Sequence, residues 1–143
     1  MKRIIVLILI ICLLYGCDKT PQPINYGTDT CHFCQMTIVT KTHASQMVTD
    51  KGKQYKFDAI ECMVNFLGDK QELITKSNLL ITNYKKPGIM INAKTSKYVI
   101  SEEITSPMGA NLTGFVSLKQ AKTTINNPTA EYLDWNGIFK KLN

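Results

Sequence analysis

The segment DTCHFCQMTIVT, residues 29–40, brings together side chains that can bind a metal ion or form a disulfide. It holds Cys31 and Cys34 in a CxxC arrangement, with His32 between them and Met36 two residues beyond the second cysteine. Such a pair can be a redox disulfide, half of a zinc site, or part of a site for a softer metal ion. The rest of the sequence has to discriminate between these possibilities.

The redox and zinc possibilities have weak support. In a redox pair, a helix that starts at the motif lowers the pKa of the first cysteine, but the β-branched residues after Cys34 make a poor helix start. Structural zinc requires four nitrogen or sulfur ligands, usually as two close pairs, and the sequence has no second pair at suitable spacing. Zinc could still be held by four separate positions: Cys31, Cys34, Cys62 and His43.

Met36 favours the third possibility. Thiolate and thioether sulfur atoms select Cu(I) over harder divalent ions, and on an extended strand Cys34 and Met36 would point to the same face. A thioether has no proton to lose and cannot form a disulfide, so it still binds metal in an oxidising compartment. The pattern therefore favours a Cys/Met copper site, with Cys62, His43 and His32 as possible additional ligands.

The start of the chain predicts export. Residues 1–16, MKRIIVLILIICLLYG, have the basic start and apolar core of a secretory signal peptide, and the core is shorter than the roughly 20 residues that span a bilayer. The sequence LLYGC resembles the lipobox of bacterial lipoproteins, in which the cysteine, here Cys17, carries the lipid, although Tyr15 replaces the usual small residue. We therefore expect a membrane-anchored lipoprotein on the periplasmic side.

Export also limits the partners and adds an alternative. Removal of residues 1–16 would take away two basic residues and lower the formal net charge from +6 to +4. Without a lysine run, and outside the cytoplasm, the protein is not expected to bind nucleic acid. Oxidising compartments favour disulfides in small domains, so a Cys31–Cys34 or Cys31–Cys62 disulfide in a structural or scaffold lipoprotein, without metal, is an alternative function.

The segment 17–30 is polar and proline-containing, which predicts a lipidated flexible tether that reaches on the order of 20 Å. The folded domain is expected to span residues 31–143. Its first part has a good hairpin turn at Asp50–Gly52. The β-prone runs around this turn are 35–40, 44–49 and 53–57.

The clearest helix lies in FDAIECMVNFLGD. Asp58 is suited to cap it, with Glu61 three residues further on, and Gly68 can end it. The apolar residues that share one face are Ile60, Met63, Val64 and Leu67.

The second half repeats the pattern of the first, which predicts an α+β fold of two ββαβ-like units packed together, roughly 31–85 and 86–143. The tail AEYLDWNGIFKKLN is expected to cover an apolar face. The other expected elements are a buried strand at 78–84, a turn at 85–88, hairpin strands at 88–93 and 97–101, a glycine-broken strand or loop at 107–117 and a helix at 117–125.

Several of these segments together resemble the NosL family of copper-binding lipoproteins, which accompany nitrous oxide reductase. The resemblance covers nearly the whole mature chain, and Gln35 replaces the glycine that is usual in the CxxCGM motif. An ordinary extended backbone is expected at Gln35. The matching segments are the CxxCxM motif at 31–36, Phe57-Asp58, Asn92-Ala93 with Tyr98-Val99, and Pro107-Met108-Gly109 with Phe115.

The resemblance implies a copper chaperone that binds Cu(I) outside the cytoplasm. It also implies delivery of copper to nitrous oxide reductase during its maturation in denitrification, together with an ABC-transporter-type membrane complex. The fold implied is a pair of ββαβ units. Met108 lies on a turn between Pro107 and Gly109, where an exposed apolar side chain is unfavourable unless it packs or binds something. It is therefore the first candidate for a metal ligand, ahead of Cys31, Cys34 and Met36, although a methionine often only fills a core.

No catalytic motif accompanies these residues. Cysteine catalysis needs a base within hydrogen-bond reach and an oxyanion site, and the spacing of the cysteines and histidines indicates neither. The sequence predicts a binding and transfer protein and not an enzyme.

Overall fold

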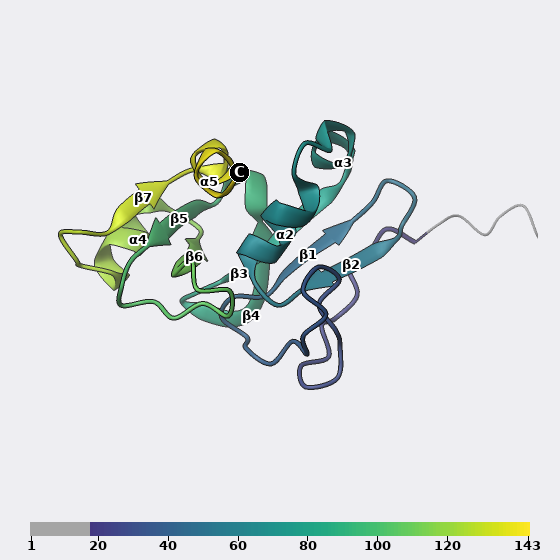
Figure 1. Ribbon diagram of the computed structural model, residues 1–143, viewed down its shortest axis with the longest axis horizontal. Coiled ribbons are helices and arrows are strands. Elements are labelled where there is room, and N and C mark those ends of the chain that lie inside the picture. The colour runs from purple at the N-terminus through teal and green to yellow at the C-terminus, as the bar shows by residue number, and fades with distance from the viewer. Residues whose placement is uncertain (1–17) are drawn as a thin grey trace, which may run out of the picture.

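The computed structural model describes residues 18–143, so the predicted signal peptide and Cys17 lie outside the described residues (Figure 1). Within these residues four α-helices and one 3-10 helix accompany a seven-stranded sheet, which confirms the α+β fold class. In the part of the chain described, none of the helices has the length and apolar character needed to cross a bilayer.

The first half forms one ββαβ unit. Its elements are β1 (Ser45–Val48), β2 (Gln54–Phe57), α2 (Ile60–Leu67), α3 (Gln71–Lys76) and β3 (Asn78–Asn83). β1 pairs antiparallel with both β2 and β3 and therefore lies between them. Gly52 has a φ of 80° in the connection between β1 and β2, which confirms the predicted hairpin turn.

The elements of the second half are β4 (Lys86–Asn92), η1 (Ala93–Thr95), β5 (Lys97–Ile100), β6 (Leu112–Phe115), α4 (Leu118–Thr124), β7 (Glu131–Leu133) and α5 (Trp135–Leu142). The ββαβ order recurs in β5, β6, α4 and β7, with β4 and η1 before it and α5 after it. The predicted hairpin of 88–93 with 97–101 is wrong, because β4 pairs with β3 while β5 pairs with β6 and β7. The reason is η1, where the Asn92 side chain accepts hydrogen bonds from the backbone of Lys94 and Thr95 and turns the chain away.

The two units join through β3 and β6. The strand order is β2-β1-β3-β6-β5-β7, with β4 also on β3, and the β3–β6 contact is parallel with Asn83 opposite Gly114. Gly114 is required here because a Cβ atom at this position would collide with the Ile81 side chain. Figure 1 shows α2 and α5 close together above this junction, where they close the main core.

The predicted helix at 58–68 is confirmed as α2, but its cap is not. α2 begins at Ile60 with Ala59 as N-cap and ends at Leu67 with Gly68 as C-cap, whose φ is 44° and whose N–H donates to the Val64 carbonyl. The prediction that Asp58 and Glu61 form the cap is wrong, because Asp58 lies one residue too early and the Glu61 carboxylate accepts a hydrogen bond from Ser106. Both carboxyl groups are buried.

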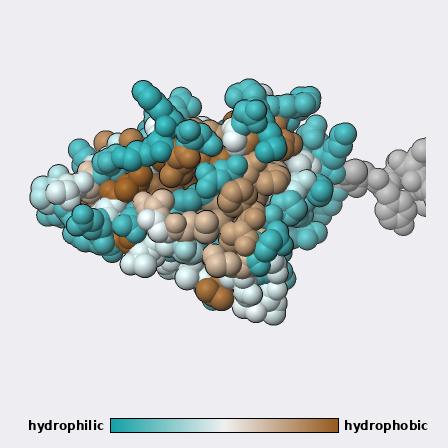
Figure 2. Space-filling model, in the orientation of Figure 1, coloured by the Kyte–Doolittle hydropathy of each residue, from teal (hydrophilic) through white to brown (hydrophobic). Residues whose placement is uncertain are grey.

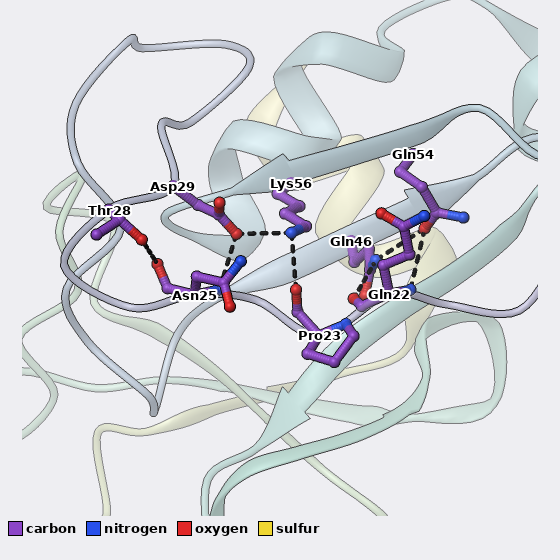
Figure 3. A network of polar contacts seen from close by, with 8 residues as sticks. All are labelled: Gln22, Pro23, Asn25, Thr28, Asp29, Gln46, Gln54 and Lys56. Atoms are coloured by element: carbon purple, nitrogen blue, oxygen red, sulfur yellow. Dashed lines mark hydrogen bonds and ion pairs between the residues drawn. The ribbon is translucent and has the colours of Figure 1, made fainter.

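Residues 20–29, which we call the N-terminal strap, are attached to the domain (Figure 3). The Gln54 side chain donates to the Thr20 carbonyl at 3.2 Å, Gln46 to the Gln22 carbonyl at 2.9 Å and Lys56 to the Pro23 carbonyl at 2.7 Å. The expectation of a free tether therefore does not hold for this part of 17–30. The cause is one face of the β1–β2 pair, where the register places Gln46, Gln54 and Lys56 together and their side chains donate to the carbonyls of the strap.

The tail packs as predicted. Asp134 caps α5 by accepting a hydrogen bond from the Gly137 N–H at 2.8 Å. The Trp135 ring lies 4.8 Å from that of Phe139 and 6.3 Å from that of Tyr98 between ring centres, and Ile138 is fully buried. The amphipathic α5 therefore covers the apolar face beside α2.

Candidate metal centre

Three cysteine side chains lie close together, two from the loop before β1 and one from α2. Among residues 18–143, Cys31, Cys34 and Cys62 form the group of potential metal ligands, with their sulfur atoms all within 4.8 Å of one another. Cys31 and Cys62 are fully buried, Cys34 is partly exposed, and all three are free thiols. The arrangement is a compact set of three sulfur donors that solvent reaches on the Cys34 side.

A tight turn brings Cys31 and Cys34 together. The Gln35 N–H donates to the Cys31 carbonyl at 3.0 Å, and the Cys31 N–H donates to the Met36 carbonyl at 2.8 Å. Gln35 has a φ of 64°, so the expectation of an extended backbone at this position is wrong. The left-handed conformation is unfavourable for glutamine, but its side-chain amide donates to the His32 carbonyl at 3.1 Å and holds the turn closed.

The turn also changes the expected strand. Of the run 35–40, only Thr37 makes a bridge, and its partner is Thr30. Cys34 and Met36 therefore do not lie on one face of a strand as expected, because Gln35 between them has a left-handed backbone conformation. Met36 is 46% exposed next to the thiols, and its role as a ligand stays a prediction.

Cys62 comes to the same place from α2. The apolar face of α2 packs into the main core and places Cys62 beside Cys31 and Cys34. The sequence named Cys62 only as a possible additional ligand, because its position on the helix also suits a buried inert thiol. The fold brings it within reach of the CxxC motif, which lies about thirty residues away in the chain.

The pKa values of the three thiols differ because of their hydrogen bonds. The pKa of Cys31 is lowered to about 4, mainly because the Cys62 thiol donates a hydrogen bond to the Cys31 sulfur. Backbone N–H groups of Asp58, Cys34 and Phe33 lower it further, while burial raises it. Donation to Cys31 and burial raise the pKa of Cys62, and burial raises that of Cys34. At neutral pH the group therefore holds one thiolate in a ring of donors.

Two buried carboxyl groups border the thiols. Asp58 and Glu61 are each about 2% exposed, and burial raises the pKa of both. Within residues 18–143, one oxygen of each side chain, Oδ1 of Asp58 and Oε2 of Glu61, has no hydrogen-bond partner. Asp58 also faces the charge of Cys31, which raises its pKa further.

The loop that carries Met108 attaches next to Cys62. The Ser106 hydroxyl donates to the Glu61 carboxylate, and Glu61 is the residue before Cys62 on α2. Met108 lies on the turn between Pro107 and Gly109, and it is 39% exposed. The assignment of Met108 as a ligand stays a prediction.

Neither histidine belongs to the thiol group. The His32 ring packs edge-on against Tyr55 and Phe66, at 4.5 and 5.2 Å between ring centres, and the His32 backbone N–H donates to the Lys56 carbonyl. His43 is buried with Nδ1 3.1 Å from the Leu112 carbonyl, and burial lowers its pKa. The zinc set of three cysteines with His43 is therefore not assembled among the described residues.

Lys56 links the thiol loop to the N-terminal strap (Figure 3). Its ammonium group lies 2.6 Å from the Asp29 carboxylate, and its carbonyl accepts from the His32 N–H at 2.9 Å. The Asp29 carbonyl in turn accepts from the Ile38 N–H at 2.9 Å. Lys56 thus holds the start of this loop at Asp29 and its middle at His32, while Asp29 holds the far end at Ile38.

Exposed hydrophobic side chains lie on the two loops near the thiol group. Figure 2 shows hydrophobic residues in patches across the middle of one face, with mostly hydrophilic margins. The exposed large apolar residues in the two loops next to the thiols are Phe33, Met36, Val39 and Met108. A rim of this kind is typical of a surface that another molecule contacts.

Sequence reasoning did not find the roles of Asp58, Glu61, Ser106 and Lys56 around the thiols. The available signal was Glu61, an acidic residue inside the apolar run AIECMV, where a charge on a core-facing helix needs a buried partner. Its spacing from Asp58 fitted a helix cap equally well. The partner, Ser106, is 45 residues away and only the fold reveals it.

Comparisons with known proteins agree with this fold. A family model described as NosL matches residues 23–141. The crystal structure of the copper chaperone NosL from Shewanella denitrificans superposes with a TM-score of 0.69 at 23% sequence identity, covering 83% of this chain and 95% of that chain. None of the curated proteins matches the sequence significantly.

Proposed function

The chain belongs to the NosL family, and on that premise we propose that it is an extracytoplasmic protein that binds copper as Cu(I) and passes it to a partner. The observation that carries the proposal is the convergence of Cys31, Cys34 and Cys62, with sulfur atoms within 4.8 Å of one another. The similar structure from Shewanella denitrificans is that of a copper chaperone, which agrees with the prediction of a binding protein without a reaction of its own.

The chemistry of the donors supports Cu(I). Three sulfur donors suit a soft monovalent ion, which needs fewer ligands than zinc. Structural zinc would require a fourth nitrogen, oxygen or sulfur ligand, and among residues 18–143 no histidine, aspartate or glutamate joins the three thiols. The lowered pKa of Cys31 supplies a thiolate before metal arrives, and metal ligands must be deprotonated. Met108 and Met36 are the proposed thioether ligands from the rim.

Transfer requires that a partner reach the ion. Cys34 is partly exposed, and the two methionines lie at the surface rather than in the core. An incoming sulfur or nitrogen ligand can therefore replace a rim ligand before the buried thiols release the ion. The apolar rim would exclude water during this exchange.

The proposed recipient is nitrous oxide reductase during its maturation, reached with an ABC-transporter-type complex at the membrane. This part of the proposal depends on family membership and on the predicted lipid at Cys17, which lies outside the described residues. The lipid would keep the protein at the membrane surface, where such a complex is located.

Copper binding is tested by competition with a chromogenic Cu(I) chelator under reducing, oxygen-free conditions. We expect one Cu(I) per chain, and Cys31→Ser, Cys62→Ser and Met108→Ala each to weaken binding by at least the roughly 10–100-fold that accompanies loss of outer-shell partners. Met90→Ala is the matched control, because Met90 lies on β4 and contacts Thr82 instead. A parent protein with no measurable Cu(I) affinity would reject the proposal and favour the structural lipoprotein.

Delivery is tested in a denitrifying host that lacks its own chaperone of this type. The full chain should restore the copper content of purified nitrous oxide reductase, and the Cys62→Ser chain should not. Equal restoration by both chains would exclude delivery through the thiol site.

A further inference from the structure

The loop from Ser106 to Asn111 is closed on itself by hydrogen bonds to Ser106. The Gly109 N–H donates to the Ser106 carbonyl at 3.0 Å, and the Asn111 N–H donates to the Ser106 hydroxyl at 2.9 Å. Gly109 and Asn111 both have positive φ, at 78° and 54°, so the chain doubles back sharply within these residues. Met108 is at the tip of this loop.

The base of the loop is fastened to α2 at one buried point. The Ser106 hydroxyl donates to Oε1 of Glu61, a contact in which Ser106 is about 4% and Glu61 about 2% exposed. The Ala110 backbone also contacts the Glu61 carboxylate, and Ala110 packs against the core cluster that contains Cys31 and Cys62. The loop tip, by contrast, is partly exposed at Met108.

Glu61 therefore connects two parts of the proposed copper site. It precedes Cys62 in α2, so its backbone moves with that thiol, and its side chain holds the loop that carries Met108. A buried carboxylate is unfavourable unless it has a hydrogen-bond partner. Oε1 of Glu61 has such a partner in the loop, whereas Oε2 has no hydrogen-bond partner among residues 18–143. Packing alone does not explain this arrangement, because an apolar residue would fill the same place.

We infer that Glu61 and Ser106 are positioning residues that set the location of Met108 relative to Cys62, so that the thioether and the thiols hold one ion together. The inference rests on the proposed function, because it assumes that Met108 binds the ion. It adds two residues that touch no metal themselves and act only through Met108.

The test compares Cu(I) affinities of matched variants by chelator competition. Ser106→Ala should weaken Cu(I) binding by about tenfold, in the range seen for loss of outer-shell partners. Glu61→Gln keeps an oxygen that accepts from Ser106 and should bind close to the parent, whereas Glu61→Ala should resemble Ser106→Ala. Ser101→Ala is the control, because Ser101 is equally buried and its hydroxyl bonds elsewhere.

The decisive measurement is the double variant Ser106→Ala/Met108→Ala. If Ser106 acts only through Met108, this variant should bind Cu(I) no more weakly than Met108→Ala alone. Independent, multiplying losses would overturn the inference, because they would indicate general damage to the fold.

The remaining outcomes separate the inference from the function. Unchanged affinity in Ser106→Ala, with a loss in Met108→Ala, would overturn the positioning role and leave the copper function intact. Unchanged affinity in Met108→Ala would reject Met108 as a ligand, and the inference with it. Because Ser106→Ala removes only a hydroxyl, it keeps the test informative if Glu61→Ala fails to fold.

Discussion

Replacing Cys62 by alanine should raise the pKa of the Cys31 thiol in the metal-free protein. The hydrogen bond from the Cys62 thiol is the largest cause of the lowered pKa of Cys31, which is about 4. Alanine removes this donor and leaves the backbone N–H groups of Asp58, Cys34 and Phe33 in place. The variant thus separates the contribution of the thiol from that of the backbone.

The size of the change follows from the energy of one hydrogen bond. A hydrogen bond to a charged group contributes about 1.5–3 kcal/mol, and one pKa unit corresponds to about 1.4 kcal/mol. We therefore expect the pKa of Cys31 to rise by about 1–2 units. It should remain below the ordinary value of 9.0, because the backbone donors persist.

The same change has a consequence for stability. The pKa of Cys31 is lower in the folded protein than in the unfolded chain, so ionised Cys31 stabilises the fold above the unfolded pKa near 9.0, and this contribution is lost as the pH falls toward about 4. Cys62→Ala should reduce the pH dependence of the unfolding free energy over this interval. Comparison with Cys31→Ser cancels the contributions of the other titrating groups.

The assay is a pH titration of the ultraviolet absorbance of the thiolate, with metal-free protein under reducing conditions. Cys34→Ser in a chain that starts at Asp18 serves as the background for both proteins. Because the pKa of Cys62 is raised, the absorbance change on the acidic side then reports Cys31. Met63→Ala controls for lost packing, because Met63 is buried on the same helix. An unchanged or lower midpoint in the Cys62→Ala protein would refute the assignment of Cys62 as the donor.

Other perturbations test the frame around the site. Gly114→Ala should lower the unfolding free energy by about 1–3 kcal/mol in chemical denaturation, because the added Cβ collides with Ile81 in a packed core; an unchanged midpoint would mean that the β3–β6 junction is looser than described. Lys56→Met should lower the unfolding free energy by about 1–2 kcal/mol, because the ion pair of Lys56 with Asp29 is partly buried. Lys141→Met should lower it by less than about 0.5 kcal/mol, because the ion pair of Lys141 with Glu131 is exposed. Equal losses in the two variants would contradict this ranking. Burial lowers the pKa of His43, so the unfolding free energy should fall as the pH drops below the unfolded pKa of 6.5, by up to about 1.4 kcal/mol per pH unit. His43→Asn should remove that part of the pH dependence in thermal melts at about pH 5–8.

Local patterns predicted most of the first unit. The apolar spacing of α2, Gly68 at its end and Gly52 in the hairpin turn each act within a few residues of themselves, and the structure confirms them. The hairpin of 88–93 with 97–101 failed because η1 separates the two strands and β4 pairs with β3 while β5 pairs with β6. Propensity contains no information about that choice.

The site was predictable in its donors and not in their surroundings. The CxxC motif and the soft side chains near it are visible in the sequence, and Cys62 was visible as a candidate. The conformation of Gln35 was mispredicted because a side-chain hydrogen bond offsets the backbone preference. Glu61 and Ser106 escaped notice because their contact joins positions far apart in the chain.

The N-terminal strap limits how far the domain can stand from a bilayer. Thr20 is already bonded to Gln54, so only two residues separate Cys17 from the first attachment to the body. Three extended peptide units reach about 10 Å. If Cys17 carries a lipid, the domain would lie next to the lipid headgroups with little freedom to rotate. A protein that accepts the metal ion would then need its own binding site close to the membrane surface.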